Sequence, residues 1–198
     1  GATTEAAGTA TFTVVLDSEP TADVTMGVSS SDVSEGTVNT ASLVFTSGNW
    51  NTPQTVTVTG VDDAIDDGDQ GYNIILAAVT SSDSNYSGVN PVDVSVSNTD
   101  NDSAGISVSA ISGATTEDGT RATFTAVLNS EPTADVTIGV SSSDTGEGTV
   151  STASLTFTSG NWNAPQAVTV TGVDDAIDDG NQAYSIVLAA ATSSDSNY

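Results

Sequence analysis

The chain has 198 residues, of which 26 are acidic and one is basic, giving a net charge of -25 with no histidine and no cysteine. This negative charge would repel nucleic acid and anionic lipids, so we expect neither as a partner. The absence of cysteine excludes disulfides and thiolate metal sites. The longest apolar run, Ile74 to Val79, is far too short for membrane insertion.

The sequence repeats itself, and the ungapped match aligns Gly1 with Gly113 and Tyr86 with Tyr198. Of these 86 aligned pairs, 68 are identical, which indicates duplication within a tandem array. We therefore predict two domains, residues 1–100 and 101–198. We expect the first to lack its first strand and the second its last, as in an internal piece of a longer protein.

Each repeat contains short segments in which apolar and polar residues alternate, separated by Gly, Pro, Asn, Asp and Ser. The strands predicted in the first repeat are residues 9–17, 22–30, 41–46, 53–61, 70–79 and 91–98. Those predicted in the second are 105–111, 121–129, 134–142, 153–158, 165–173 and 182–191. This pattern is typical of an immunoglobulin-like sandwich. The predicted fold class is therefore all-β, with tandem immunoglobulin-like β-sandwich repeats whose period is the spacing from Gly1 to Gly113.

Acidic residues follow every second predicted strand, so an up-and-down strand order would bring them to one end of each sandwich. In the first repeat these are Glu5, Asp32, Glu35, Asp62, Asp63, Asp66, Asp67, Asp100 and Asp102. Their mutual repulsion would destabilise the fold unless a cation neutralised it. Ca²⁺ binds about six to eight oxygen atoms in irregular geometry, so we predict that it is the cofactor.

The sharpest acidic motif is VDDAIDDG, at Val61–Gly68 and Val173–Gly180. It is not an EF-hand, because the twelfth position counted from Asp63 is Ile74, where a bidentate Glu is required. The glycine-rich nonapeptide of calcium-binding β-helices is also absent. A site assembled from several turns remains.

The segments TTE, SSSD with EGT, VTVTGVDDAIDDG and VDVSVSNTDND closely resemble Calx-beta domains, especially those of large bacterial secreted or cell-surface proteins. The resemblance covers essentially the whole chain and implies calcium ligands in the turns at one end. The implied ligands are Glu5, Asp32, Asp62, Asp63, Asp100, Asp102, Glu117, Asp144, Asp174 and Asp175. Asp66, Asp67, Asp178 and Asp179 stand where many members have Glu and are further candidates. The second repeat has no acids after a last strand, so we expect its site to be incomplete.

Other interpretations of the acids stay open: they could be solvated turn formers, or belong to a generally acidic, halophilic surface. An enzyme is not expected, because His, Cys and Lys are absent and only paired carboxylates could act. We expect a calcium-binding structural repeat of a secreted or cell-surface protein, acting as a calcium-rigidified stalk or filament.

An adhesive module that recognises a glycan or protein is the alternative, for which turn residues Trp50 and Trp162 would be the candidates. Capping of the core is the simpler role for these aromatic side chains. Neighbouring repeats of the same protein are the expected partners, and assembly into a homopolymer or filament is compatible with the sequence.

Overall fold

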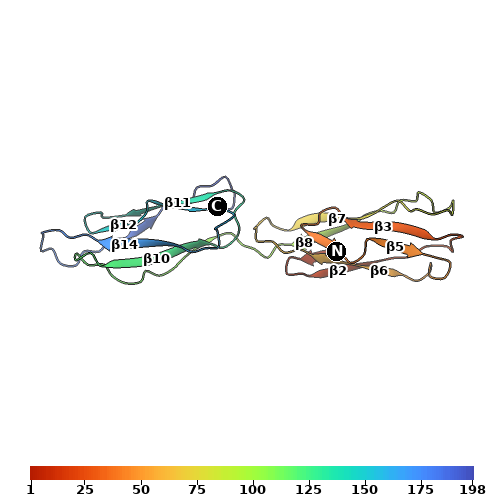
Figure 1. Ribbon diagram of the computed structural model, residues 1–198, viewed down its shortest axis with the longest axis horizontal. Coiled ribbons are helices and arrows are strands. Elements are labelled where there is room, and N and C mark those ends of the chain that lie inside the picture. The colour runs from red at the N-terminus through yellow and green to blue at the C-terminus, as the bar shows by residue number, and fades with distance from the viewer. The chain divides into compact units, whose positions relative to one another are not determined.

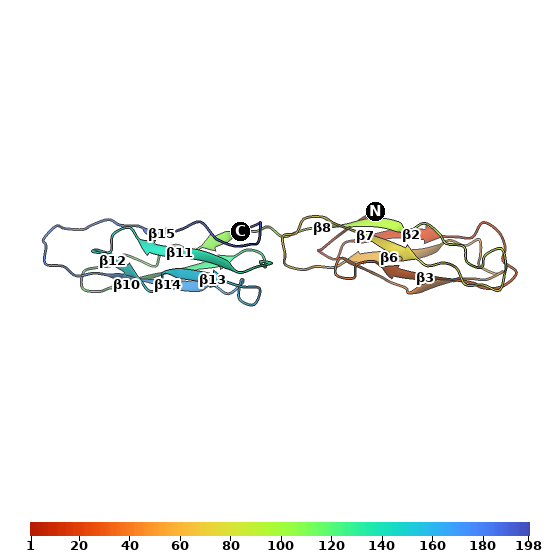
Figure 2. The same cartoon turned by 90° about the horizontal axis from the view of Figure 1, so that it is seen from above.

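The computed structural model describes residues 1–198, which form two compact units without any helix (Figures 1 and 2). The first unit comprises residues 1–63 and 67–101, and the second comprises 64–66 and 102–198. Each unit is a sandwich of two β-sheets, which confirms the predicted all-β fold class. The structure contains no helix that is long and apolar enough to cross a membrane.

The first unit consists of eight strands. They are β1 (Ala2–Thr4), β2 (Thr9–Val14), β3 (Val24–Ser30), β4 (Gly36–Val38), β5 (Ser42–Phe45), β6 (Gln54–Gly60), β7 (Gln70–Leu76) and β8 (Val94–Thr99). One sheet has the order β1-β8-β7-β3-β5, and the other has the order β2-β6-β4. All pairs are antiparallel except β1 with β8, which are parallel.

The second unit consists of seven strands. They are β9 (Ile106–Val108), β10 (Arg121–Leu128), β11 (Val136–Ser142), β12 (Gly148–Val150), β13 (Ser154–Phe157), β14 (Gln166–Gly172) and β15 (Ile186–Leu188). Its sheets have the orders β13-β11-β15 and β12-β14-β10-β9, and all pairs are antiparallel.

Alternation along the strands places one set of side chains between the two sheets. In β6, Val56 and Val58 are buried while Thr55 is exposed. The core of each unit consists mainly of Val, Ile and Leu around a fully buried ring, Phe45 in the first unit and Phe157 in the second. Burial of one such aliphatic side chain contributes about 1.5–3 kcal/mol, so these strand faces hold the sheets together.

The structure differs from the predicted strands in several places. The short strands β1, β4 and β12 were not expected, because three residues are too few to show a period. The strand predicted at residues 182–191 is reduced to β15, Ile186–Leu188. In the first unit the equivalent strand β7 also pairs with β8, and no strand of the chain lies on that side of β15.

One turn of the first unit has a strained residue that the second repeat avoids. Ala7 has a φ of 59°, and its counterpart Gly119 has a φ of 78°. This left-handed conformation costs a residue with a Cβ atom about 1–2 kcal/mol, whereas glycine adopts it freely. We expect Ala7→Gly to raise the free energy of unfolding of the first unit by up to about 1 kcal/mol, measured by urea denaturation.

The neighbouring residue provides the matched control for this prediction. Ala6 has a negative φ, so Ala6→Gly should only increase the entropy of the unfolded chain and lower the stability. Equal losses of stability in both variants would contradict the strain at Ala7.

Candidate metal centre

Two turns of the first unit bring three carboxylates together. Glu35 lies between β3 and β4, and Asp63 and Asp67 lie in the turn between β6 and β7. One carboxylate oxygen from each of the three lies within 4.8 Å of the others. Glu35 is buried, with 8% of its surface exposed, while both Asp residues are exposed. The cluster is therefore buried at Glu35 and open to solvent at the two Asp residues.

Backbone contacts fix Glu35 in this position. Its carbonyl accepts a hydrogen bond from the Val61 N–H at 3.0 Å, which ties the two turns together. Gly36 follows, and a Cβ atom there would overlap the buried ring of Tyr72. A glycine directly after Glu35 is therefore required for the chain to pass this ring, and the carboxylate is directed towards the Asp63 turn.

Asp32 stabilises the turn that precedes Glu35. Its carboxylate accepts hydrogen bonds from the backbone N–H of Ser34 at 3.0 Å and from the Ser34 hydroxyl at 2.5 Å. These hydrogen bonds, the hydroxyl first, hold the pKa of Asp32 below its ordinary value. Asp32 is therefore a turn-capping residue in this structure, and it is not one of the three clustered carboxylates.

The environment of Glu35 disfavours its charged form. Burial raises the pKa of Glu35 above its ordinary value of 4.5, and the negative charges of the nearby Asp carboxylates raise it further. A hydrogen bond from the Asn98 side-chain amide, at 3.4 Å, acts in the opposite direction. The single basic side chain, Arg121 on β10, cannot offset 26 acids. A cation bound at this cluster would relieve the repulsion.

The second unit repeats the same cluster at the equivalent positions of its sequence. One oxygen each from Glu147, Asp175 and Asp179 lies within 4.8 Å of the others. Burial raises the pKa of Glu147, and nearby carboxylates, Asp179 first, raise it further. The same three positions therefore converge in both units.

A second group of carboxylates in the first unit brings together residues from the beginning and the end of its sequence. Glu5, just after β1, is buried with 2% of its surface exposed, and it lies within 4.8 Å of Asp100, measured between carboxylate oxygens. The Asn101 N–H donates to Glu5 at 3.0 Å, and the Gly68 N–H donates to Asp100 at 2.7 Å. The backbone thus already holds both carboxylates in place.

Two of the remaining predicted residues of the first repeat, Asp62 and Asp66, lie outside these groups. Asp62 accepts a hydrogen bond from the Asn101 side chain at 2.9 Å. Asp66 and Asp102 belong to the second unit. The Asp66 carboxylate accepts a hydrogen bond from the Ala104 N–H at 2.7 Å. The other predicted residues are exposed and lie outside the Glu147 cluster: Glu117, Asp144, Asp174 and Asp178.

Sequence reasoning did not identify the central residue of either cluster as a ligand. Glu35 was predicted to be among the converging acids but not among the ligands, and Glu147 was predicted to be neither. The available signal was a Glu immediately before the glycine of an EGT segment, in both repeats. That pattern identifies the Glu as a ligand only once the structure shows the Tyr ring that packs against the glycine.

Two further buried acids have a structural role. Asp83 accepts hydrogen bonds from the backbone N–H groups of Thr21 at 2.8 Å and Asn85 at 2.9 Å, which hold its pKa below the ordinary value. Asp195 has the equivalent contacts in the second unit, and its pKa is also lowered. The interpretation as turn formers therefore fits these two acids.

These opposite pKa shifts predict the pH dependence of the metal-free chain. Because the pKa of Glu35 and Glu147 is raised, a stability penalty develops as pH rises above 4.5. Because the pKa of Asp83 and Asp195 is lowered, their stabilising effect is present above 3.8 and is lost as pH falls through the lowered pKa. We expect the melting temperature, measured by circular dichroism, to be highest between about pH 3.8 and pH 4.5 and to fall towards neutral pH.

The general negative charge would also lower stability at neutral pH, so a matched variant is needed. With Glu35→Gln and Glu147→Gln combined, the fall in melting temperature between pH 4.5 and 7 should be clearly smaller. An equal fall in both proteins would show that the two clustered Glu residues do not cause it.

Comparison with known proteins adds evidence that is independent of this geometry. A model of the Calx-beta domain matches residues 2–102 and again residues 100–197. None of the curated proteins matches the chain.

Three solved structures are among those similar to this chain. The crystal structure of CBD12 from CALX1.2 has 15% sequence identity and a TM-score of 0.41, and covers 96% of this chain and 77% of that chain. The crystal structure of calcium binding domain CBD12 of CALX1.1 has 18% sequence identity and a TM-score of 0.39, and covers 88% of this chain and 73% of that chain. The crystal structure of a protein of unknown function from Porphyromonas gingivalis W83 has 12% sequence identity and a TM-score of 0.39, and covers 86% of this chain and 77% of that chain. On the two family matches, the chain belongs to the Calx-beta domain family and contains two such domains.

Proposed function

We propose that this chain is a calcium-binding structural repeat of a larger extracellular or cell-surface protein, and that calcium stabilises and stiffens it as part of a stalk or filament. The observation that carries the proposal is the carboxylate cluster, in which one Glu and two exposed Asp oxygens lie within 4.8 Å of one another in both units. Membership of the Calx-beta family supports the same conclusion.

The residues present fit a calcium ion. Glu35, Asp63 and Asp67 would hold it in the first unit, and Glu147, Asp175 and Asp179 in the second. All six offer hard carboxylate oxygens on turns, a donor set that suits Ca²⁺, whereas Mg²⁺ requires nearly ideal octahedral geometry. Glu5 and Asp100 form a further pair of candidate ligands. The bound ion would neutralise charge that no side chain of the chain offsets.

A repetitive structural role is supported by the near identity of the two copies, 68 of 86 aligned pairs, because a module selected for a specific ligand would be expected to diverge. An extracellular location is consistent with an open site built mainly from exposed carboxylates. Extracellular calcium modules bind with a Kd of about 0.1–1 mM.

The alternative role as an adhesive module has no specific observation in its favour. The Tyr86 hydroxyl donates to the Ser18 carbonyl at 2.6 Å, and Tyr198 makes the same contact with Ser130 at 3.0 Å. Trp162 packs against the core of the second unit. These aromatic side chains support their own turns and do not form a free platform for a glycan. We likewise propose no enzymatic activity.

Calorimetric titration of the metal-stripped chain with calcium chloride tests the proposal. We expect saturable binding at one or more sites in each unit, and much weaker binding of magnesium at the same ionic strength. Replacing Glu35 and Glu147 by Gln should remove most of the calcium heat. The proposal fails if calcium and magnesium give the same unsaturable response, because the acids would then attract ions only diffusely.

A further inference from the structure

Strand β5 lies at the edge of the five-stranded sheet of the first unit, and β13 lies at the equivalent edge of the second unit. In an antiparallel pair, alternate residues bond to the partner strand, and those between them direct their N–H and C=O groups away from it. The Val28 N–H of β3 donates to the Ala41 carbonyl at 2.9 Å. Ser42 and Val44 of β5, and Thr46 directly after it, therefore direct their backbone groups outwards. Such an edge is a template for pairing with another strand.

The features that commonly protect a sheet edge are absent from this one. Charged side chains and proline usually prevent edge-to-edge pairing. However, residues 36–61 and 148–173, which contain β5 and β13, include no charged residue, although the whole chain has 26 acids. Neither strand contains proline, and Val44 on β5 is 43% exposed. These two edges therefore need another form of protection.

Side chains of the same unit bind the outward backbone groups of β5. The Thr40 hydroxyl donates to the Ser42 carbonyl at 2.8 Å and accepts from the Ser42 N–H at 3.4 Å. The Gln54 side-chain amide donates to the Val44 carbonyl at 2.7 Å. A strand that approached this edge would have to displace these bonds before it could form its own.

Asn49 binds the edge on both sides of Phe45. Its side-chain amide donates to the Val44 carbonyl at 3.2 Å, and its side-chain oxygen accepts from the Thr46 N–H at 2.6 Å. The Thr46 carbonyl accepts from the backbone N–H of Trp50 at 3.0 Å. Of the outward groups from Ser42 to Thr46, this leaves the Val44 N–H.

The second unit has the same arrangement around β13. The Gln166 side-chain amide donates to the Thr156 carbonyl at 2.7 Å, as Gln54 does to Val44. Three residues make the contacts equivalent to those of Thr40, Asn49 and Gln54, and we call the six together the edge caps: Thr152, Asn161 and Gln166. The caps are retained although the edge residue between them changes from Val44 to Thr156.

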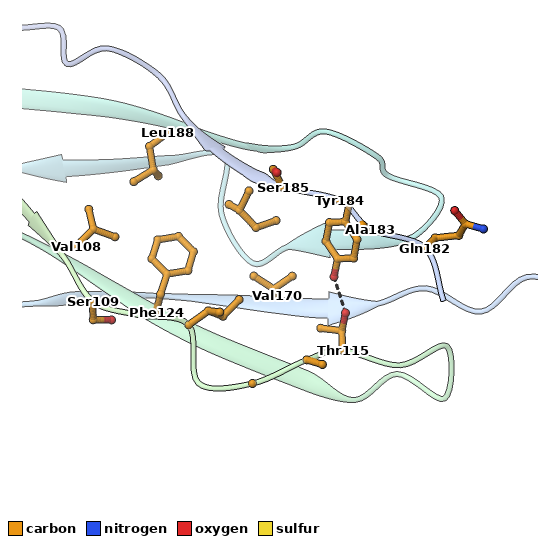
Figure 3. Close-up of a pocket in the computed structure, with 14 residues that line it drawn as sticks. Val108, Ser109, Thr115, Phe124, Val170, Gln182, Ala183, Tyr184, Ser185 and Leu188 are labelled. Carbon is orange, nitrogen blue, oxygen red and sulfur yellow. Dashed lines mark hydrogen bonds between the residues drawn. The ribbon is translucent and has the colours of Figure 1, made fainter. Parts of the chain in front are cut away.

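Not every edge of the second unit is capped. Strand β15, at the opposite edge of the same sheet, borders a groove of about 510 Å³ lined by Phe124, Val170 and Leu188 (Figure 3). No side chain forms a hydrogen bond with the backbone of Ile186 or Leu188 on this strand. Capping is therefore a particular property of the β5 and β13 edges.

From these contacts we infer that the edge caps close β5 and β13 to strand addition, and that the partner they exclude is the same strand of another copy. Because the two repeats are identical at 68 of 86 aligned positions, like edges are present together at high local concentration. Misassembly between like domains is a characteristic failure of repeat proteins. In the proposed stalk or filament, contacts between copies would use other surfaces. This inference goes beyond the calcium function and needs no bound ion.

The test is to remove the caps of the first unit with Thr40→Ala, Asn49→Ala and Gln54→Ala. We expect this variant to self-associate at least about tenfold more tightly than the unsubstituted chain, through pairing of two β5 strands. Sedimentation equilibrium in metal-stripped buffer with about 1 M sodium chloride measures this, because the Debye length is then about 3 Å and repulsion between the acidic chains is screened. Hydrogen exchange should show the Val44 N–H becoming protected as the concentration of the variant rises.

A matched variant replaces exposed neighbours that bind none of the outward groups, with Thr25→Ala, Asn51→Ala and Thr55→Ala. It should associate no more than the unsubstituted chain. Because Asn49 also supports its own turn, a second variant keeps it and carries only Thr40→Ala and Gln54→Ala. Circular dichroism verifies that each variant is folded.

Three results would overturn the inference. In the first, the folded cap variants associate no more tightly than the unsubstituted chain. In the second, the matched variant associates as tightly as they do. In the third, the Val44 N–H of the unsubstituted chain already becomes protected with rising concentration. Because calcium is absent from every sample, failure of the calcium proposal would leave these outcomes unchanged.

Discussion

Calcium at about 10 mM should raise the melting temperature of the metal-stripped chain by about 10–20 °C. An ion that binds only the folded state stabilises it by RT ln(1 + [L]/Kd), which is about 2.7 kcal/mol at a hundredfold excess over Kd. For domains of this size, 1 kcal/mol shifts the melting temperature by about 4–8 °C. The gain comes from neutralising clustered carboxylates, among them Glu35 and Glu147, whose charged forms burial disfavours.

Screening of charge by salt would also stabilise such an acidic chain, so the control must hold ionic strength constant. Sodium chloride at the same ionic strength, and magnesium chloride at the same concentration, should each give a much smaller increase, followed by scanning calorimetry or circular dichroism. Equal increases in all three salts would mean that the acids respond as a diffuse surface charge and that no calcium site stabilises the fold.

Replacing Glu35 by Gln should change stability in opposite directions with and without calcium. Without the ion, the substitution removes a buried charge that its surroundings disfavour, so the melting temperature should rise. With calcium, the substitution removes one negatively charged ligand from the Glu35, Asp63 and Asp67 cluster. The calcium affinity should therefore fall at least about tenfold, and the rise in melting temperature that calcium causes should become smaller. Thermal melting in both buffers and calorimetric titration measure the two effects.

Two matched variants identify the source of the effect. Asp17→Asn removes the same charge from an exposed position outside the cluster and should change neither quantity appreciably. Asp32→Asn removes the cap on Ser34 and should lower stability in both buffers, with a smaller loss of affinity than Glu35→Gln. If Asp32→Asn weakened calcium binding more than Glu35→Gln, the ligand set implied by the family resemblance would be the correct one, and Glu35 would only support it.

The sequence alone determines the fold class and the general location of the acids. Alternation such as Val56 and Val58 with Thr between them specifies strands with one buried face, and the internal repeat specifies two similar units. Strand parity is also readable, so acids after every second strand meet at one end. These features are local in sequence, which is why no tertiary information is needed to infer them.

Only the tertiary structure decided which acids lie together and which segments become strands. Glu35 joins Asp63 because the Val61 N–H binds its carbonyl and the Tyr72 ring restricts Gly36, and these contacts connect residues far apart in the chain. Likewise, QGYNIIL is a complete strand beside β8, while QAYSIVL is mostly irregular at a sheet edge. A β-strand is stabilised by hydrogen bonds and side-chain packing with its neighbours, so the partner, and not the segment itself, determines how much of it forms.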